Sequence, residues 1–136
     1  MNRLPVTIVA VEVHGSIAVV DTAIGSHCFT ATLVGASDEV ASWSAGMPAT
    51  LLFKETEVSL AKNLSGLISM RNRIPAIVRA IEHGMLLTKV TLAFGDNLIE
   101  SVITTRSSHA LGLAVGDVVE GLVKANEMTV MPESYP

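Results

Sequence analysis

Hydrophobic and polar residues alternate along most of the chain, as residues 77–81 and 98–103 illustrate. Val, Ile and Thr dominate these runs, and glycine-containing breaks separate them at Gly84, Gly95 and Gly116. A period of two in branched residues is typical of strands that bury one face, and glycines mark the turns between such strands. The pattern therefore predicts about five short strands in each half of the chain.

One segment, residues 107–113, departs from this alternation. Its sequence, Ser-Ser-His-Ala-Leu-Gly-Leu, offers hydroxyl side chains that can cap a helix and a glycine at which the helix can stop. We expect a single helical turn here, between the third and fourth strands of the second half. Five strands with one short helix are typical of a small closed or half-closed barrel of the OB type.

The chain also repeats itself. When the sequence is shifted by 70 residues, residue 72 lies over residue 2 and the two halves align without a gap. Glycines, prolines and lysines coincide, at Pro5/Pro75, Gly25/Gly95, Gly46/Gly116 and Lys54/Lys124. Such agreement over a full half predicts two copies of one module, at residues 1–64 and 65–136. The predicted fold is all-β, with two tandem OB-like five-stranded barrels that each carry one short helical turn.

Composition adds an expectation of assembly. Of the 136 residues, 49% are hydrophobic and 16% are charged, so apolar surface exceeds what one small module can bury. The segment that joins the copies, residues 62–66, is short and polar, which favours modules that pack together. We therefore expect the surplus to be buried between the halves and between subunits of a homo-oligomer.

The distribution of charged and apolar residues argues against membrane and export roles. The longest stretch without charge, residues 22–37, is shorter than the roughly 18–20 apolar residues of a spanning helix and contains polar side chains. Residues 1–7 do not have the basic and apolar pattern of a signal peptide. The expected location is the cytoplasm, without a membrane partner.

Charge and aromatic content weaken a nucleic-acid role. The net charge is −4, and 4% of residues are aromatic. A single-strand binder of the OB type needs a basic groove with stacking aromatics, so this function remains only an alternative. The sequence contains no nucleophile-elbow, phosphate-loop or paired-carboxylate pattern, so we expect no enzyme. The four histidines and Cys28 have no metal-ligand spacing, so we expect no direct cation site, and we expect Cys28 to be a small buried hydrophobe.

Three groups of side chains could donate hydrogen bonds to an oxyanion. Ser69, Arg71 and Asn72 form the first group, and the planar fork of an arginine suits a tetrahedral oxyanion. The alternative is a polar strand entry with Arg71 in solvent. Thr104 and Ser107, at the expected helical turn, form the second group, because free N–H groups at such a turn can hold an anion.

Local sequence allows a plainer role for the second and third groups. Simple N-capping by Ser107 or Ser108 is the alternative for the second. The third group is Lys124, the lone charge of the expected last strand, residues 121–125. A lysine there commonly extends to solvent or protects a sheet edge. Its equivalent, Lys54, stands at the same place in the first copy, which favours a role within the module.

Taken together, residues 68–75, 103–107, 111–113 and 122–125 resemble, in order and spacing, the Mop or TOBE module of molbindins. The whole chain is similar to a double-module molbindin. This resemblance implies reversible binding of molybdate or tungstate, for storage, buffering or homeostasis of molybdenum, with no catalytic cofactor. It also implies a trimer of double modules. Related modules occur in molybdate-responsive transcription factors and transporter ATPases, so a sensing role towards such a partner is the alternative.

The resemblance also implies where the anion lies. Binding pockets would form where two modules meet. One module would supply Ser69, Arg71, Asn72 and Lys124 with the backbone of Ala125, and its neighbour would supply Thr104 and Ser107.

The first copy departs from this motif. At the same shift Met1 replaces Arg71, Val34 replaces Thr104, and nothing corresponds to Ser69. A possible weaker site retains only Asn2, Ser37 and Lys54. We therefore expect fewer high-affinity sites than two equivalent modules would provide.

Overall fold

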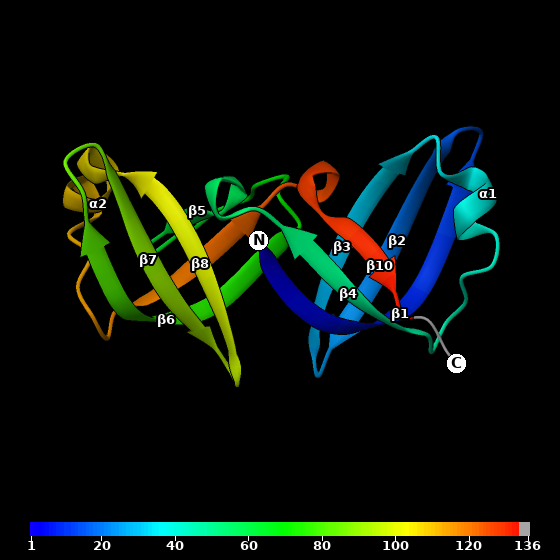
Figure 1. Ribbon diagram of the computed structural model, residues 1–136, viewed down its shortest axis with the longest axis horizontal. Coiled ribbons are helices and arrows are strands. Elements are labelled where there is room, and N and C mark those ends of the chain that lie inside the picture. Colours follow the sequence, from blue (N-terminus) through cyan, green and yellow to red (C-terminus); the bar gives the residue numbers. More distant parts are fainter. Residues whose placement is uncertain (134–136) are drawn as a thin grey trace.

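The computed structural model describes residues 1–133, apart from the side chain of Ser37. The chain forms two five-stranded antiparallel sheets that lie side by side, each coiled around its own half of the core (Figure 1). The elements of the first half are β1 (Asn2–His14), β2 (Ile17–Ile24), β3 (His27–Val34), α1 (Ser37–Val40), β4 (Pro48–Phe53), the 3₁₀ turn η1 (Glu55–Glu57) and β5 (Ser59–Ala61). Those of the second half are β6 (Asn72–His83), β7 (Leu87–Phe94), β8 (Asn97–Thr104), α2 (Thr105–Leu111), β9 (Val118–Val123), the 3₁₀ turn η2 (Ala125–Glu127) and β10 (Thr129–Pro132).

The internal repeat of the sequence is a repeat of structure. β2, β3, β4 and η1 return in the second half as β7, β8, β9 and η2 with the same lengths, shifted by the same 70 residues. Even the irregularity of the first strand is repeated, because the pairing register shifts between Ile8 and Ala10 and again between Val78 and Ala80. The two halves are therefore equivalent in backbone and differ in side chains.

The alternating pattern buries one face of each strand. In β1 the side chains of Leu4, Val6 and Ile8 are buried and the residues between them are exposed. β6 repeats this arrangement in the second half, and buried residues from both halves form one hydrophobic cluster. Among the described residues, no helix is long and apolar enough to cross a membrane.

Two local predictions were wrong. The second-half helix covers seven residues instead of one turn, because Thr104 rather than a serine provides the N-cap and Gly112 adopts a left-handed conformation (φ 58°) that ends it. Cys28 is exposed instead of buried, since its neighbour Phe29 takes the inward position on β3. The structure also adds η1 and η2, which the alternation did not reveal.

Each sheet takes its fifth strand from the other half of the chain. β10 pairs with β4, so a strand of the second half completes the sheet of β1 to β4. β5 pairs reciprocally with β9 and completes the sheet of β6 to β9. Figure 1 shows β10 in red among the blue and cyan strands of the first half. The boundary between the two modules at residues 64 and 65 stays a prediction. The hydrogen-bonded sheets exchange strands across this boundary.

Two buried asparagines add a second, equally reciprocal link. The amide of Asn72 donates to the carbonyl of Thr30 at 2.8 Å and accepts from the Thr30 N–H at 2.7 Å. Asn2, its equivalent, makes the same pair of bonds at 2.8 Å with the backbone of Glu100. Asn2 and Asn72 are the first residues of β1 and β6, so each asparagine fastens the start of its strand to a strand of the opposite sheet, β8 or β3.

The strand exchange can be tested with engineered disulfides. Thr50 and Met131 are directly opposed on β4 and β10, at a separation that a disulfide can bridge. We expect Thr50→Cys/Met131→Cys, in a Cys28→Ser background, to form an intrachain disulfide that non-reducing peptide mapping detects. The control is Thr50→Cys/Ala61→Cys, because Ala61 holds the place equivalent to Met131 but pairs with Glu120. A disulfide in the control and none in the test pair would contradict the exchange.

The asparagine link predicts a stability loss. Asn72→Ala leaves the Thr30 N–H and C=O without their partner, so the free energy of unfolding should fall by about 1–3 kcal/mol. Asn97→Ala removes an amide from the start of β8 instead and should change the free energy of unfolding by less than about 0.5 kcal/mol. Urea unfolding followed by circular dichroism measures both values. Equal losses in the two variants would show that the buried link contributes nothing.

Candidate anion-binding site

Four of the predicted binding residues meet at one cavity on the seam between the two sheets. The cavity has a volume of about 260 Å³ and is lined by Ser69, Arg71, Lys124 and Ala125, together with Thr32, Met70 and Asn126. Ser69 and Arg71 lie in the segment between β5 and β6, and Lys124 and Ala125 lie where β9 passes into η2. The cavity therefore forms where the chain leaves the second sheet through η2, beside the segment that leads into β6.

The segment between β5 and β6 is fixed at both ends. At its start the ammonium of Lys62 donates to the carbonyls of Leu111 and Gly112 and to Asp117, at 3.0–3.2 Å. This contact holds the pKa of the Asp117 carboxyl below its usual value, and it places a cation at the C-terminal end of α2. At its end the segment is held by Asn72, whose amide is bound to Thr30 of β3. Arg71 immediately precedes this anchor, which explains why it lies beside Thr32 of the same strand.

The other wall of the cavity is the entrance to η2. Lys124 has an extended backbone (φ −65°, ψ 143°) and immediately precedes the turn, whose first bond runs from the Glu127 N–H to the Lys124 carbonyl at 3.0 Å. The first N–H groups of a helical turn have no partner within the turn. Lys124 was expected in a last strand of residues 121–125, but β9 ends at Val123, so the lysine stands at the strand end.

The lining has the chemistry of an anion site. Arg71 and Lys124 provide two positive charges, and Ser69, Thr32 and Asn126 provide uncharged donors. Within residues 1–133, no acidic side chain lines this cavity. Cationic donors make shorter and stronger hydrogen bonds to an oxyanion than neutral donors do. The arrangement can therefore hold a small oxyanion by hydrogen bonds and charge.

Asn72 and two residues of the possible weaker site, Asn2 and Lys54, do not line this cavity. Asn72 lies next to the cavity, but its side chain is fully buried and both ends of its amide are bonded to Thr30. Asn2 is held in the same way by Glu100. Lys54 is exposed at the entrance to η1, the first-half equivalent of Lys124. Ser37 begins α1, and its side chain lies outside the described part of the chain.

Thr104 and Ser107 lie at the opposite end of β6 from the cavity. Thr104 caps α2 by accepting from the Ser107 N–H at 3.1 Å, and the two hydroxyls are bonded at 2.7 Å. Thr104 also lines a second cavity of about 480 Å³ beside the exposed residues Met85, Leu86 and Leu87. Within one chain, the two predicted groups therefore do not meet.

Three lining residues escaped the sequence analysis. Met70 and Asn126 adjoin predicted residues, and only the backbone path shows that they face the cavity. Thr32 comes from the first half, which the motif of the second half does not include. The repeat held one signal for it, since Val102 occupies the equivalent position. A hydroxyl in one copy and an apolar side chain at the equivalent position of the other mark a place where the two halves differ in chemistry.

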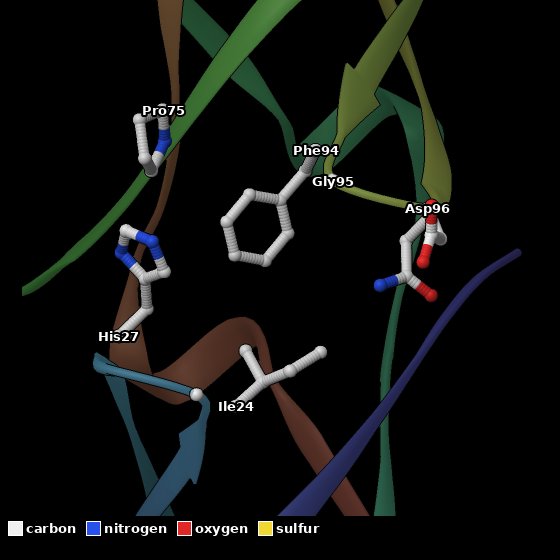
Figure 2. A pocket seen from close by; sticks show the side chains of 8 residues that line it. Ile24, His27, Pro75, Phe94, Gly95 and Asp96 are labelled. Carbon is white, nitrogen blue, oxygen red and sulfur yellow. The ribbon is translucent and has the colours of Figure 1, made fainter.

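Another cavity, of about 400 Å³, lies between the two hairpin turns that follow β2 and β7 (Figure 2). Ile24, Phe94 and Pro75 provide apolar walls, and the rings of His27 and Phe94 pack edge to face at 5.0 Å. Its charged side chain is the carboxylate of Asp96, which repels anions. Among residues 1–133, His, Cys, Asp and Glu side chains form no group of three that could hold a metal ion. The cavity beside Arg71 is therefore the better candidate.

Both halves of the chain are similar in sequence to known proteins. The TOBE domain family matches residues 1–60 and again 68–130. The molybdenum import ATP-binding protein ModC of Brucella abortus (strain 2308) is 39% identical over 80 residues, which cover 58% of this chain and 22% of ModC. The molybdenum-pterin-binding protein MopA of Rhodobacter capsulatus is 34% identical over 125 residues, which cover 90% of this chain and 46% of MopA. The chain thus spans less than half the length of each of these relatives.

A solved structure has the same fold over nearly its whole length. It is the cytoplasmic molybdate-binding protein ModG with molybdate bound, which superimposes with a TM-score of 0.89 at 27% sequence identity. The match covers 96% of this chain and 94% of ModG. The prediction of two tandem OB-like modules is thereby confirmed.

Proposed function

Because this chain belongs to the TOBE domain family and to its double-module molbindin type, we propose that it binds molybdate or tungstate reversibly, without chemistry on the anion. One observation carries this proposal. Arg71 and Lys124, which are 53 positions apart in sequence, line one small cavity with three neutral polar side chains and, among residues 1–133, no acid. ModG and MopA are described as binding molybdate and molybdenum-pterin, respectively, which supports this ligand class.

The cavity has the elements that a doubly charged tetrahedral oxyanion requires. Its four oxygens accept several hydrogen bonds, and two cations offset the cost of removing the anion from water. In this proposal Ser69 and the backbone at Ala125 donate the remaining hydrogen bonds from the same chain. Asn72 does not contact the anion but holds the segment that carries Arg71 in place, because its amide is bonded to Thr30.

We further propose that a second chain completes the site. Thr104 and Ser107 are exposed at the outer end of the second sheet, next to exposed apolar side chains that a subunit contact would bury. In a homotrimer of double modules, this end of one chain would meet the Arg71 cavity of its neighbour. The proposed role is cytoplasmic storage or buffering of the anion, without a membrane, nucleic-acid or catalytic function. ModG is described as a cytoplasmic molybdate-binding protein, which supports the location and the ligand.

Calorimetric titration tests the ligand and the site together. Wild-type protein should bind molybdate and tungstate more tightly than sulfate. Arg71→Ala should weaken molybdate binding about 10- to 100-fold, since a hydrogen bond to a charged group contributes about 1.5–3 kcal/mol. Arg79→Ala is the control, because Arg79 is an exposed arginine of β6 outside the cavity. No binding by the wild type, or equal affinities of the two variants, would refute the proposal.

Subunit mixing tests the shared site. Ser107→Asp should abolish binding by placing a carboxylate beside the anion, and Arg71→Ala should weaken it. Hetero-oligomers of these two variants contain contacts that pair an intact Arg71 with an intact Ser107, so a fraction of wild-type affinity should return. Mixing either variant with the double variant creates no such contact and should restore nothing. If the mixed oligomers bind no better than the single variants, one chain does not complete the site of another.

A further inference from the structure

The repeat places equivalents of the residues that line the Arg71 cavity on the other side of the seam, and we call this position the counterpart. Lys54 and Glu55 occupy there the places of Lys124 and Ala125, at the entrance to η1. The backbone angles of Lys54 (φ −77°, ψ 151°) are close to those of Lys124 (φ −65°, ψ 143°). The side chain of residue 55 therefore starts from the same point of the fold as the methyl group of Ala125.

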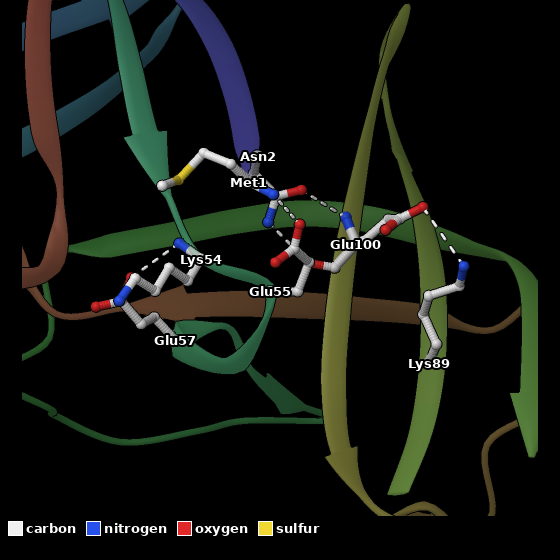
Figure 3. Close-up of polar contacts among 7 residues, drawn as sticks. All are labelled: Met1, Asn2, Lys54, Glu55, Glu57, Lys89 and Glu100. Carbon is white, nitrogen blue, oxygen red and sulfur yellow. Dashed lines mark hydrogen bonds and ion pairs between the residues drawn. The ribbon is translucent and has the colours of Figure 1, made fainter. Parts of the chain in front are cut away.

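The counterpart carries its own negative charge at this point. The carboxylate of Glu55 is paired with the terminal amine of Met1, the residue that occupies the place of Arg71 (Figure 3). This hydrogen bond, assisted by the charge of Lys89 on β7, holds the pKa of the Glu55 carboxyl below its usual value. Glu55 is therefore ionised at neutral pH, with about 29% of its side chain exposed.

The acids around the counterpart outnumber its cations. Lys89 lies near the carboxylates of Glu82 and Glu100, at 3.4 and 3.9 Å. Figure 3 shows Lys54, Glu55, Glu57 and the Met1 amine near the entrance to η1, with Glu100 and Lys89 beyond them on β8 and β7. The Arg71 cavity, in contrast, is lined by two cations and by no acid from the described part of the chain. An incoming dianion would meet a fixed like charge in the counterpart and two opposite charges in the Arg71 cavity.

We propose that Glu55 closes the first-half counterpart by standing in for the oxyanion with its own carboxylate. This inference rests on the proposed function. It identifies one position of the repeat, residue 55 in the first half and residue 125 in the second, as the position that decides which side of the seam binds the anion. The missing arginine and the change from Thr32 to Val102 would weaken the counterpart. The carboxylate opposes binding of a dianion more strongly, because juxtaposed like charges cost several kcal/mol, which lowers the affinity at least about 100-fold.

Reciprocal exchange at this position tests the proposal in the full-length protein. Calorimetry and equilibrium dialysis with molybdate give the affinity and the number of anions per chain. Ala125→Glu should lower the affinity at least about 100-fold, whereas the uncharged Ala125→Gln, of nearly the same size, should lower it less than about tenfold. Glu55→Ala should leave the main site intact and add a weaker one, so that each chain takes up further molybdate. Glu39→Ala, which removes an exposed acid of α1, should bind as the wild type does.

The outcomes separate this inference from the function on which it rests. Circular dichroism confirms that each variant is folded. If the wild type binds molybdate but Glu55→Ala takes up no more than Glu39→Ala, Glu55 does not close the counterpart. If Ala125→Gln loses as much affinity as Ala125→Glu, size rather than charge decides the position, which also overturns the inference. If the wild type binds no molybdate, the proposed function itself fails.

Discussion

Backbone pairing between the halves is the constraint on which this structure depends. β4 and β9 would each be an open edge without the short strand that arrives from the opposite half, and an open edge leaves N–H and C=O groups unpaired. β10 and β5 supply those partners. The buried amides of Asn2 and Asn72 tie the same halves together at a second level. Neither sheet is complete by itself, so the two modules form one structural unit although the sequence contains two copies.

The crossing of the chain also creates the site. The turn η2 carries the chain across the seam from β9 to β10, and the segment between β5 and β6 lies beside it, so Arg71 and Lys124 line one cavity with Thr32 of the other half. The symmetry of the repeat produces a second crossing of the same shape at η1. Different side chains then give the two crossings different electrostatics, with two cations and, among residues 1–133, no acid lining one, and an internal ion pair in the other. The repeat thus preserves the backbone of both crossings while their side chains differ.

Much of this architecture could be predicted from sequence, because it depends on local patterns. Alternation and glycine breaks predicted the strands, and the 70-residue shift predicted the tandem modules. The exchange of β5 and β10 could not be predicted, since a short apolar strand shows the same pattern whichever edge it joins. Asn72 was expected at the anion for its donor chemistry, whereas its burial against Thr30 depends on tertiary contacts. Thr32 was missed because it reaches the cavity from the copy without the motif.

Anomalous X-ray diffraction from crystals grown with molybdate is the most direct test of the central claim, because it locates molybdenum without reference to any variant. We expect a molybdenum peak beside Ser69, Arg71 and Lys124 of one chain, facing Thr104 and Ser107 of another. We expect no peak at the counterpart beside Lys54 and Glu55. Molybdenum bound equally at both crossings, or only at the cavity beside Phe94 and Asp96, would contradict this claim.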